Sequence, residues 1–202
     1  LQAIANKEFK EKVDEEMQLV SMAYDTFKYV QLNQGENMAA FKQAKGELKQ
    51  RLASLNDTLN RRMHAATHLD YEDWLKSHQP FHWLAEFYQI IKGNGGFDVI
   101  IGNPPYVTFT DASLKYNVRQ YSTYNTKNLF ALCGERFTSL VCNNASIGYI
   151  IPLSGMSIDG FESLQNIIYS NCHSWNSYYS GDRNPSELFT GVKIRAGIYI
   201  SR

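Results

Sequence analysis

The segment with the clearest capacity for chemistry is Asn103-Pro104-Pro105-Tyr106, which comes just after the apolar run Phe97–Ile101. Two consecutive prolines stiffen the chain and lack an N–H, so their carbonyl oxygens stay free to accept hydrogen bonds. Asn103 adds an amide oxygen, and Tyr106 adds a flat ring with a polar tip. Together these groups suit a planar substrate with an exocyclic amino group. Two oxygens accept its two hydrogens, while the aromatic ring stacks on its face.

The elements around this segment predict that it lies at the end of a strand. The run 97–101 is typical of a short buried strand, and open α/β sheets bind ligands at the carboxyl ends of their strands. Downstream we expect a helix over 125–143, a strand over 146–151, a helix over 159–170 with Asp159 as N-cap, and strands over 172–180 and 194–201. This order predicts a parallel-type α/β sheet whose last two strands form an antiparallel pair at its edge. The alternative is that Asn-Pro-Pro-Tyr is only a tight turn, since Pro and Asn are turn residues.

The composition is that of an ordinary globular protein. The 202 residues include 20 Lys+Arg and 20 Asp+Glu, and 44% are apolar. These values exclude a disordered chain, a collagen, a disulfide scaffold and a free-standing basic module that coats DNA. The weakly polar run 146–158 is too short to span a bilayer, and the first residues lack the apolar core of a signal peptide. We therefore expect no membrane partner and a cytoplasmic location. The three cysteines show no metal spacing, so we expect free thiols.

The first part of the chain differs from the rest. All five prolines and eleven of the thirteen glycines lie beyond residue 79. We therefore expect a helical region over 1–79 and a mixed α/β region over 80–202. Apolar residues recur at helical spacing from Ile4 to Phe27 and from Phe41 to Leu59, with Lys45 on an expected apolar site. This pattern predicts an antiparallel helical hairpin, and a dimerising coiled coil is the alternative.

Two histidines in the helical region could hold a metal ion. His64 and His68 are four residues apart, which places them on one helix face. No third ligand follows at a telling spacing, so we expect no metal site.

The Asn-Pro-Pro-Tyr segment resembles motif IV of the amino-methyltransferases, and this form is typical of N6-adenine-specific DNA methyltransferases. The resemblance implies that Asn103, Pro104, Pro105 and Tyr106 form the catalytic motif. Asn103 and the Pro104 carbonyl would hold and polarise the adenine amino group, and Tyr106 would stack on the base after it flips out of the duplex.

The surrounding segments are similar to the type IIG-like group of restriction–modification methyltransferases. They are Pro80–Trp83, Gly95–Asp98, Asn128–Phe130 (motif V), Gly148–Ser154 and Arg183–Arg195 (motif VIII), so the resemblance covers 80–202. It implies that Phe189 packs on the far side of the flipped base, although Phe189 could also be plain core. Asn128 is either a helix N-cap or a cofactor contact. Lys127, Arg119 and Arg183 would make minor phosphate contacts.

The resemblance implies the C-terminal half of a class I (Rossmann-like) methyltransferase sheet, preceded by a helical hairpin insertion. The cofactor would be S-adenosylmethionine, contacted by Asn103 and Asn128, and the partner would be duplex DNA with a flipped adenine. The glycine-rich motif I of the family is absent, since Gly93–Gly96 precedes a strand and reads as a turn. We therefore expect an inactive fragment of a longer protein.

Such a fragment has an unpaired strand edge at 97–101. We expect it to dimerise there or through helices 1–79, or to cover the edge with these helices. Two other functions stay open. One is a protein-glutamine or ribosomal-RNA amino-methyltransferase, and the other is a non-catalytic oligomerisation fragment.

Overall fold

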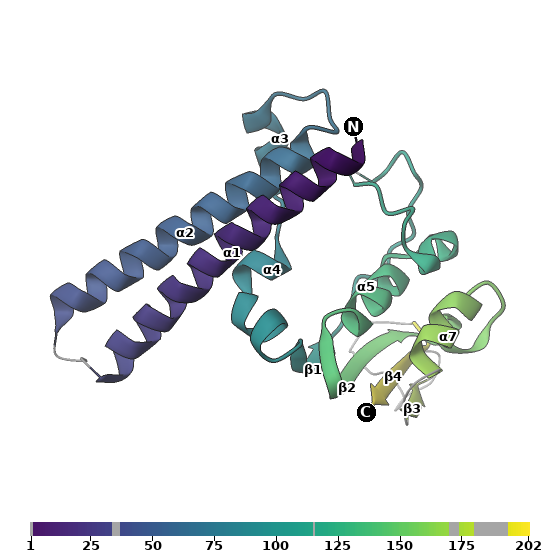
Figure 1. Ribbon diagram of the computed structural model, residues 1–202. Helices are drawn as coiled ribbons and strands as arrows, with labels where there is room; N and C mark the ends of the chain where they lie inside the picture. The colour runs from purple at the N-terminus through teal and green to yellow at the C-terminus, as the bar shows by residue number, and fades with distance from the viewer. Residues whose placement is uncertain (1, 34–36, 115, 170–173, 180–193) are drawn as a thin grey trace. The chain divides into compact units, whose positions relative to one another are not determined.

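The computed structural model describes residues 2–33, 37–114, 116–169, 174–179 and 194–202 (Figure 1). The chain forms two compact units, Leu1–Gln89 and Ile90–Arg202, and each is described below by itself.

The first unit is built on a long helical hairpin. Helices α1 (Gln2–Asn33) and α2 (Met38–His64) run side by side in opposite directions, as the apolar spacing predicts (Figure 1). Asn37 begins α2 by accepting the Ala40 N–H on its side chain at 3.0 Å. The core comprises Val13, Met17, Val20, Leu55 and Ala85. The seam differs from the prediction at one point, because the buried residue of that turn is Ala44 while Lys45 is exposed.

Short helices complete the first unit. Helix α3 (Tyr71–His78) is capped by the Asp70 carboxylate, and it is followed by α4 (Trp83–Glu86) and the π-helix η1 (Gln89–Gly93), which crosses into the second unit. The Nε2 atom of His64 lies 2.7 Å from the Leu69 carbonyl oxygen, and its ring packs edge-on against Trp74. This histidine is thus engaged in packing. Among the residues that the structure describes, no three potential metal ligands cluster together. None of the described helices is long and apolar enough to cross a membrane.

The second unit contains a four-stranded mixed sheet. Its strands are β1 (Phe97–Gly102), β2 (Val141–Pro152), β3 (Ser174–Tyr179) and β4 (Ala196–Ser201), in the order β1-β2-β4-β3. Strand β1 is parallel to β2, and β4 is antiparallel to both β2 and β3. The mixed α/β class and the parallel first pair agree with the sequence prediction.

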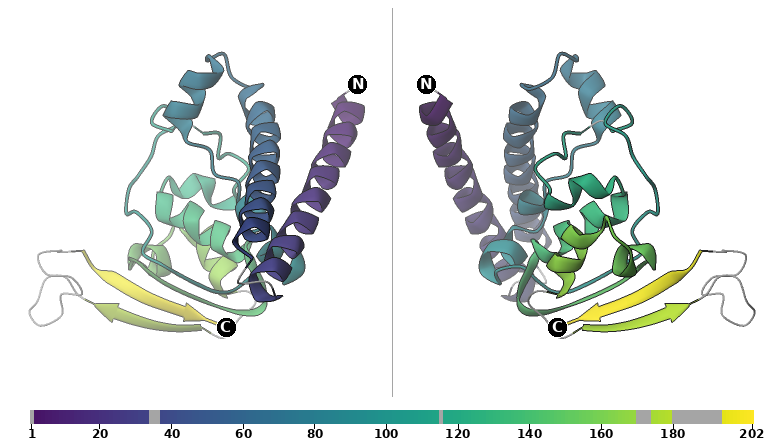
Figure 2. Two further views of the ribbon diagram at one scale, coloured as in Figure 1. Left: turned by 90° about the vertical axis from the view of Figure 1, so that its left-hand side faces the viewer. Right: turned by 90° about the vertical axis from the view of Figure 1, so that its right-hand side faces the viewer.

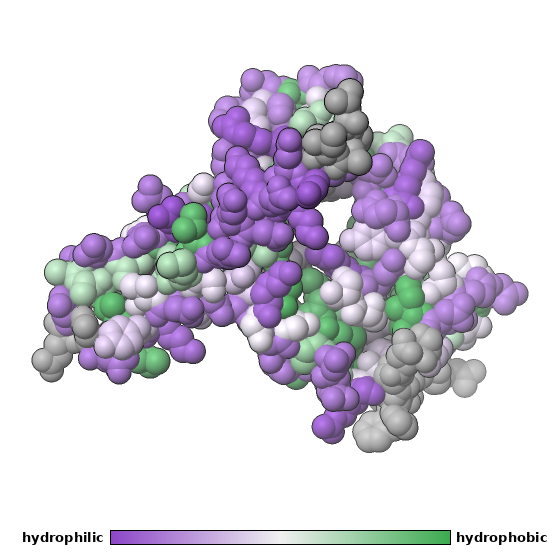
Figure 3. All heavy atoms as spheres, in the orientation of Figure 1, coloured by the Kyte–Doolittle hydropathy of each residue, from purple (hydrophilic) through white to green (hydrophobic). Residues whose placement is uncertain are grey.

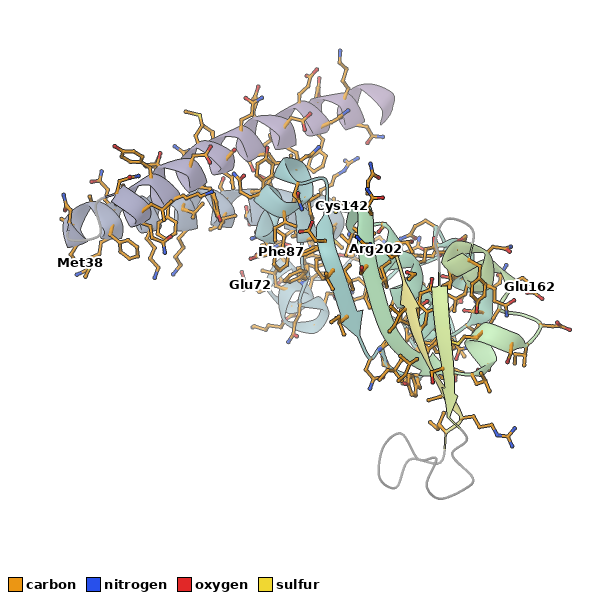
Figure 4. The ribbon with its side chains drawn as sticks, turned by 90° about the horizontal axis from the view of Figure 1, so that it is seen from below. Met38, Glu72, Phe87, Cys142, Glu162 and Arg202 are labelled. Carbon is orange, nitrogen blue, oxygen red and sulfur yellow. The ribbon has the colours of Figure 1, made fainter. Side chains whose placement is uncertain are left out.

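The last two strands form the antiparallel pair at the sheet edge that the sequence predicts. Strands β3 and β4 lie side by side in Figure 2, with β3 as the outer strand and β4 between β3 and β2. Six residues of β4 pair with the carboxyl half of β2, so both edges of β4 have hydrogen-bonding partners. Because β2 and β4 run in opposite directions, the beginning of β2 and the end of β4 lie at the same end of the sheet. Figure 4 shows this at the labelled residues Cys142 and Arg202.

One face of the sheet is covered by α5 (Leu129–Thr138), α6 (Ser154–Ser157) and α7 (Glu162–Tyr169). Alternate residues of β2 point into this core, and it comprises Phe130, Ala131, Ile147, Tyr149, Ile151, Met156, Phe161, Leu164, Ile168 and Tyr199. On the other face of β1, Val99 and Ile101 are 55% and 84% exposed. Hydrophobic atoms show over this β1–β2 end of the sheet in Figure 3.

Two helix boundaries differ from the prediction. The segment predicted as a helix over 125–143 is a 3-10 turn η2 (Ser122–Thr126), then α5, then the start of β2. The left-handed backbone of Lys127, at φ 53°, interrupts the helix, and pairing with β1 extends the chain from Val141. The predicted N-cap Asp159 lies outside α7, because Gly160 turns at φ 91° and the helix begins at Glu162.

The turn before β1 has the expected role. Gly95 and Gly96 have positive φ values of 75° and 136°, which an L side chain rarely adopts. A Cβ on Gly96 would lie 2.4 Å from the backbone carbon of Val141, so the two chains approach closely here. The turn thus brings β1 against the start of β2.

Candidate catalytic site at the end of strand β1

The Asn-Pro-Pro-Tyr segment leaves the carboxyl end of β1, where Gly102 pairs with Tyr149 of β2. Pro104 is buried, while Asn103 and Pro105 are exposed. Within the described part of the chain, the Asn103 side chain has no hydrogen-bond partner. A side-chain amide has two donors and an acceptor, so that of Asn103 is available for a ligand.

Tyr106, three residues after Asn103, is held by contacts with two other elements. Its hydroxyl donates a hydrogen bond to the Ile150 carbonyl at 3.1 Å. Its ring meets Phe130 edge to face, with centroids 6.4 Å apart and planes at 88°. Burial raises the pKa of the Tyr106 hydroxyl. The ring is therefore a fixed, neutral wall three residues from Asn103.

After Tyr106, residues 107–109 pair with residues 127–129 at the start of α5, and this pairing is here called the clip. The Leu129 N–H donates to the Val107 carbonyl at 2.9 Å, and the Phe109 N–H donates to the Lys127 carbonyl at 2.8 Å. Thr108 and Asn128 form the antiparallel bridge between these two bonds. Segments that are about twenty residues apart in sequence thus lie together at the site.

Asn128 occupies the N-cap position of α5, but its side chain makes no capping bond. Instead, its Nδ2 donates to the Thr126 carbonyl at 2.6 Å. This bond fixes the orientation of the amide, and its oxygen accepts no hydrogen bond from the described residues. That oxygen can accept a donor from a ligand.

The sequence analysis missed Glu135, which anchors the turn η2 from helix α5. Its carboxylate accepts the N–H and hydroxyl of Ser122, each at 3.0 Å, and the N–H and hydroxyl of Thr123 at 2.8 and 2.7 Å. Burial would raise the pKa of Glu135, but these hydrogen bonds outweigh it and hold the pKa below its usual range. A polar pair of Ser and Thr twelve residues before a glutamate was too weak a signal to find from sequence.

Asp111 organises a second polar cluster beyond the clip. Its carboxylate accepts hydrogen bonds from the Tyr124 hydroxyl at 2.5 Å, from Arg119 at 2.8 Å and from Lys127 at 3.0 Å. The Tyr124 hydroxyl and these two cations hold the pKa of Asp111 far below its usual range. The sequence contained a signal for this role, because Asp111 is the only acidic residue between Val99 and Gly134.

Several expected site residues cannot be placed. Phe189 and Arg183, with most of the segment that resembles motif VIII, lie outside the described residues. Among the cysteines, Cys133 and Cys142 are free thiols, and Cys172 also lies outside. The ring of His82 is half-buried, and its Nε2 atom lies 2.7 Å from Asn60 Oδ1.

The fold is that of a mixed α/β protein, and its candidate ligand site lies at the carboxyl end of strand β1. Residues 6–184 match the family described as Eco57I restriction-modification methylase, and the chain belongs to this family.

A relative from Methanocaldococcus jannaschii bears the name "Putative type II restriction enzyme and methyltransferase" and is 38% identical over 116 residues. The match spans 57% of this chain and 9% of that relative.

Proposed function

We propose that this chain forms the base-binding part of a site-specific DNA methyltransferase in a restriction–modification system. The enzyme transfers a methyl group from S-adenosylmethionine to N6 of an adenine flipped out of duplex DNA. The observation that carries this proposal is found just after β1. There Asn103 has an exposed amide with no partner among the described residues, and three residues later the Tyr106 ring is held by Ile150 and Phe130. A planar base with an amino group is bound by an acceptor for its N–H groups and by an aromatic ring that stacks on its face.

The chain's own residues act by positioning and polarisation. The Asn103 side-chain oxygen and the Pro104 carbonyl accept the two N–H groups of the adenine amino group, and this increases electron density on its nitrogen. Tyr106 stacks on one face of the base, and Phe189 packs on the other. Pro105 stiffens the loop, so the amino nitrogen is held in line with the methyl group.

S-adenosylmethionine, when bound, supplies the electrophilic methyl group. The Asn128 side-chain oxygen, which accepts no hydrogen bond from the described residues, fits its amino group, and the side-chain N–H donors of Asn103 fit its carboxylate, so these two residues would contact it.

The fold supports a partial class I, Rossmann-like sheet. Strands β1 and β2 are parallel, and β3 is parallel to β2 because β4 runs antiparallel to both. We propose that residues 80–202 contribute motifs IV to VIII and that residues 1–79 are an inserted hairpin. The free edge of β1 would pair with the cofactor half of the sheet in a longer cytoplasmic protein. In the isolated chain this edge, or helices 1–79, would form a homodimer.

The test is transfer of radioactive methyl groups to DNA by the full-length protein. We expect Asn103→Ala to lower kcat/KM at least about 100-fold, because one lost transition-state contact costs about 2.7 kcal/mol. Asn103→Asp is the matched control, because it keeps an acceptor oxygen and so loses less. Labelled N6-methyladenine in the wild type supports the proposal.

Other outcomes separate the alternatives. If DNA stays unlabelled while a protein or RNA acceptor is labelled, the amino-methyltransferase chemistry holds and the substrate is wrong. If no acceptor is labelled, the chain belongs to a non-catalytic protein. Equal rates for wild type and Asn103→Ala would refute the assigned role of the motif.

A further inference from the structure

The segment Thr110–Lys127, here called the arm, follows the clip and leads to α5. Figure 1 shows it as an extended loop between β1 and α5. From Asn103 to Gly134 the sequence contains three basic residues, Lys115, Arg119 and Lys127, against the single acid Asp111. The whole chain has no net charge, so positive charge is concentrated directly after the candidate catalytic motif.

The two described cations of the arm keep much of their binding capacity. Arg119 and Lys127 each donate one hydrogen bond to Asp111, and their side chains are 70% and 41% exposed. A guanidinium has five N–H donors and an ammonium has three, so both have further donors to offer. With one carboxylate between two cations, the cluster retains a charge of about +1.

Aromatic side chains lie among these cations. Arg119, Tyr116, Tyr124 and Asn117 are among the residues lining a hollow of about 310 Å³ on the arm. The Lys127 ammonium lies 3.5 Å from the centre of the Tyr124 ring. Cations interleaved with aromatic rings form the kind of surface that binds a nucleic acid strand.

The described residues of the arm are held in place by hydrogen bonds within the chain. The Asp111 carboxylate accepts hydrogen bonds from Arg119, Tyr124 and Lys127. Glu135 accepts hydrogen bonds from the 3-10 turn, and the clip joins the two ends of the arm. Ordering costs little free energy when the binding groups are already in place.

We propose that the arm is a docking surface for the phosphate backbone of the DNA strand that carries the target base. Arg119 and Lys127 contact phosphates close to the flipped nucleotide. The arm is close enough to the catalytic motif for these contacts, because Asp111 is eight residues beyond Asn103 and so lies at most about 27 Å from it. This inference rests on the proposed function.

The test is the salt dependence of DNA binding by the full-length protein, measured as fluorescence anisotropy of a labelled duplex between 50 and 200 mM NaCl. Each lost phosphate contact makes the slope of log K against log salt shallower by about 0.9. We expect this change for Arg119→Gln and for Lys127→Gln, and about twice the change for the double variant. Over the fourfold salt range, each single variant therefore loses about 3.5-fold less affinity than the wild type.

Two variants serve as controls. Arg119→Lys keeps the charge and should restore the wild-type slope. Lys92→Ala removes an exposed cation that precedes the amino end of β1, so it should leave the slope unchanged.

The inference and the proposed function fail differently. If the wild type binds and methylates DNA, but the Gln variants keep its slope, the arm does not contact phosphate and the proposed function stands. If Lys92→Ala changes the slope as much as the arm variants do, the effect is one of net charge and the inference is overturned. If the wild type neither binds nor methylates DNA, the proposed function has failed, and the inference fails with it.

Discussion

Replacing Glu135 by alanine should loosen the turn η2 without unfolding the sheet. The change removes one acceptor group for four donors. The two Ser122 donors are exposed and turn to water at little cost. Thr123 is 0% exposed, so its N–H and hydroxyl are left buried without an acceptor.

The magnitude follows from these two buried donors. An unsatisfied buried donor costs about 1–3 kcal/mol, so the pair costs about 3 kcal/mol. Since each 1.4 kcal/mol is a tenfold change in an equilibrium constant, local opening should become about 100-fold more frequent. Glu135→Gln keeps one acceptor oxygen and should have an intermediate effect.

Amide hydrogen exchange read by mass spectrometry measures this opening directly. Peptides covering 121–128 should exchange about 100-fold faster in Glu135→Ala, while peptides from α1 and β2 keep their wild-type rates. The matched control is Glu162→Ala, which removes from the same unit an exposed carboxylate that accepts the Gly160 N–H.

Two results would refute this reasoning. Exchange at 121–128 less than about threefold faster would mean that the carboxylate does not hold η2. Uniform acceleration through β2 would mean that Glu135 supports the whole unit and not the turn.

Four further predictions concern stability and assembly. Gly96→Ala should lower the free energy of unfolding by more than about 3 kcal/mol and lower the midpoint of thermal unfolding, because the new Cβ would lie 2.4 Å from a backbone atom. Its control is Gly46→Ala in the middle of α2, where a Cβ would have nothing within 4 Å; this variant should raise the free energy of unfolding by about 1 kcal/mol. Leu55→Ala, at 0% exposure in the hairpin core, should lose about 3 kcal/mol in urea unfolding, and a loss under 1 kcal/mol would contradict the assigned core. Burial lowers the pKa of His82 below its usual 6.5, so the unfolded state binds the proton more readily. Stability should fall as pH drops below about 6.5, and a His82→Asn variant should lack this dependence. The isolated chain should self-associate through the free edge of β1, and Ile101→Lys should shift its mass by light scattering toward the monomer; an unchanged mass would point to the helices instead.

Local patterns were enough for the hairpin and for the strand that leads into the motif. Apolar residues at helical spacing must face a partner, and the turn-type residues in the sequence at 33–37 predict that the second helix is the nearest one. The short apolar run from Phe97 to Ile101 favoured a strand, and β1 confirms it. The predicted burial of this strand is wrong, because Val99 and Ile101 are exposed at the edge of the sheet. The placement of Asn103 at a strand's carboxyl end follows from the same pattern.

Sequence periodicity was misleading where a few residues override it. Leu129, Leu132 and Leu140 share one helical face, yet the left-handed Lys127 and the pairing of Val141 with β1 confine the helix to α5. Both causes are non-local, because Lys127 is held by the Phe109 N–H and Val141 by a strand forty residues earlier.

The sequence by itself determined the chemistry of the site, because an amide, two prolines and an aromatic ring in succession have the same functional groups in any fold. Only the tertiary structure decided which groups are free and which are already used. Tyr106 bonds to Ile150, Asn128 holds Thr126, and Asp111 joins two cations, while Asn103 has no partner among the described residues. The physical reason is that a hydrogen bond depends on a distance of about 3 Å between groups far apart in sequence, and residue order alone does not specify that distance.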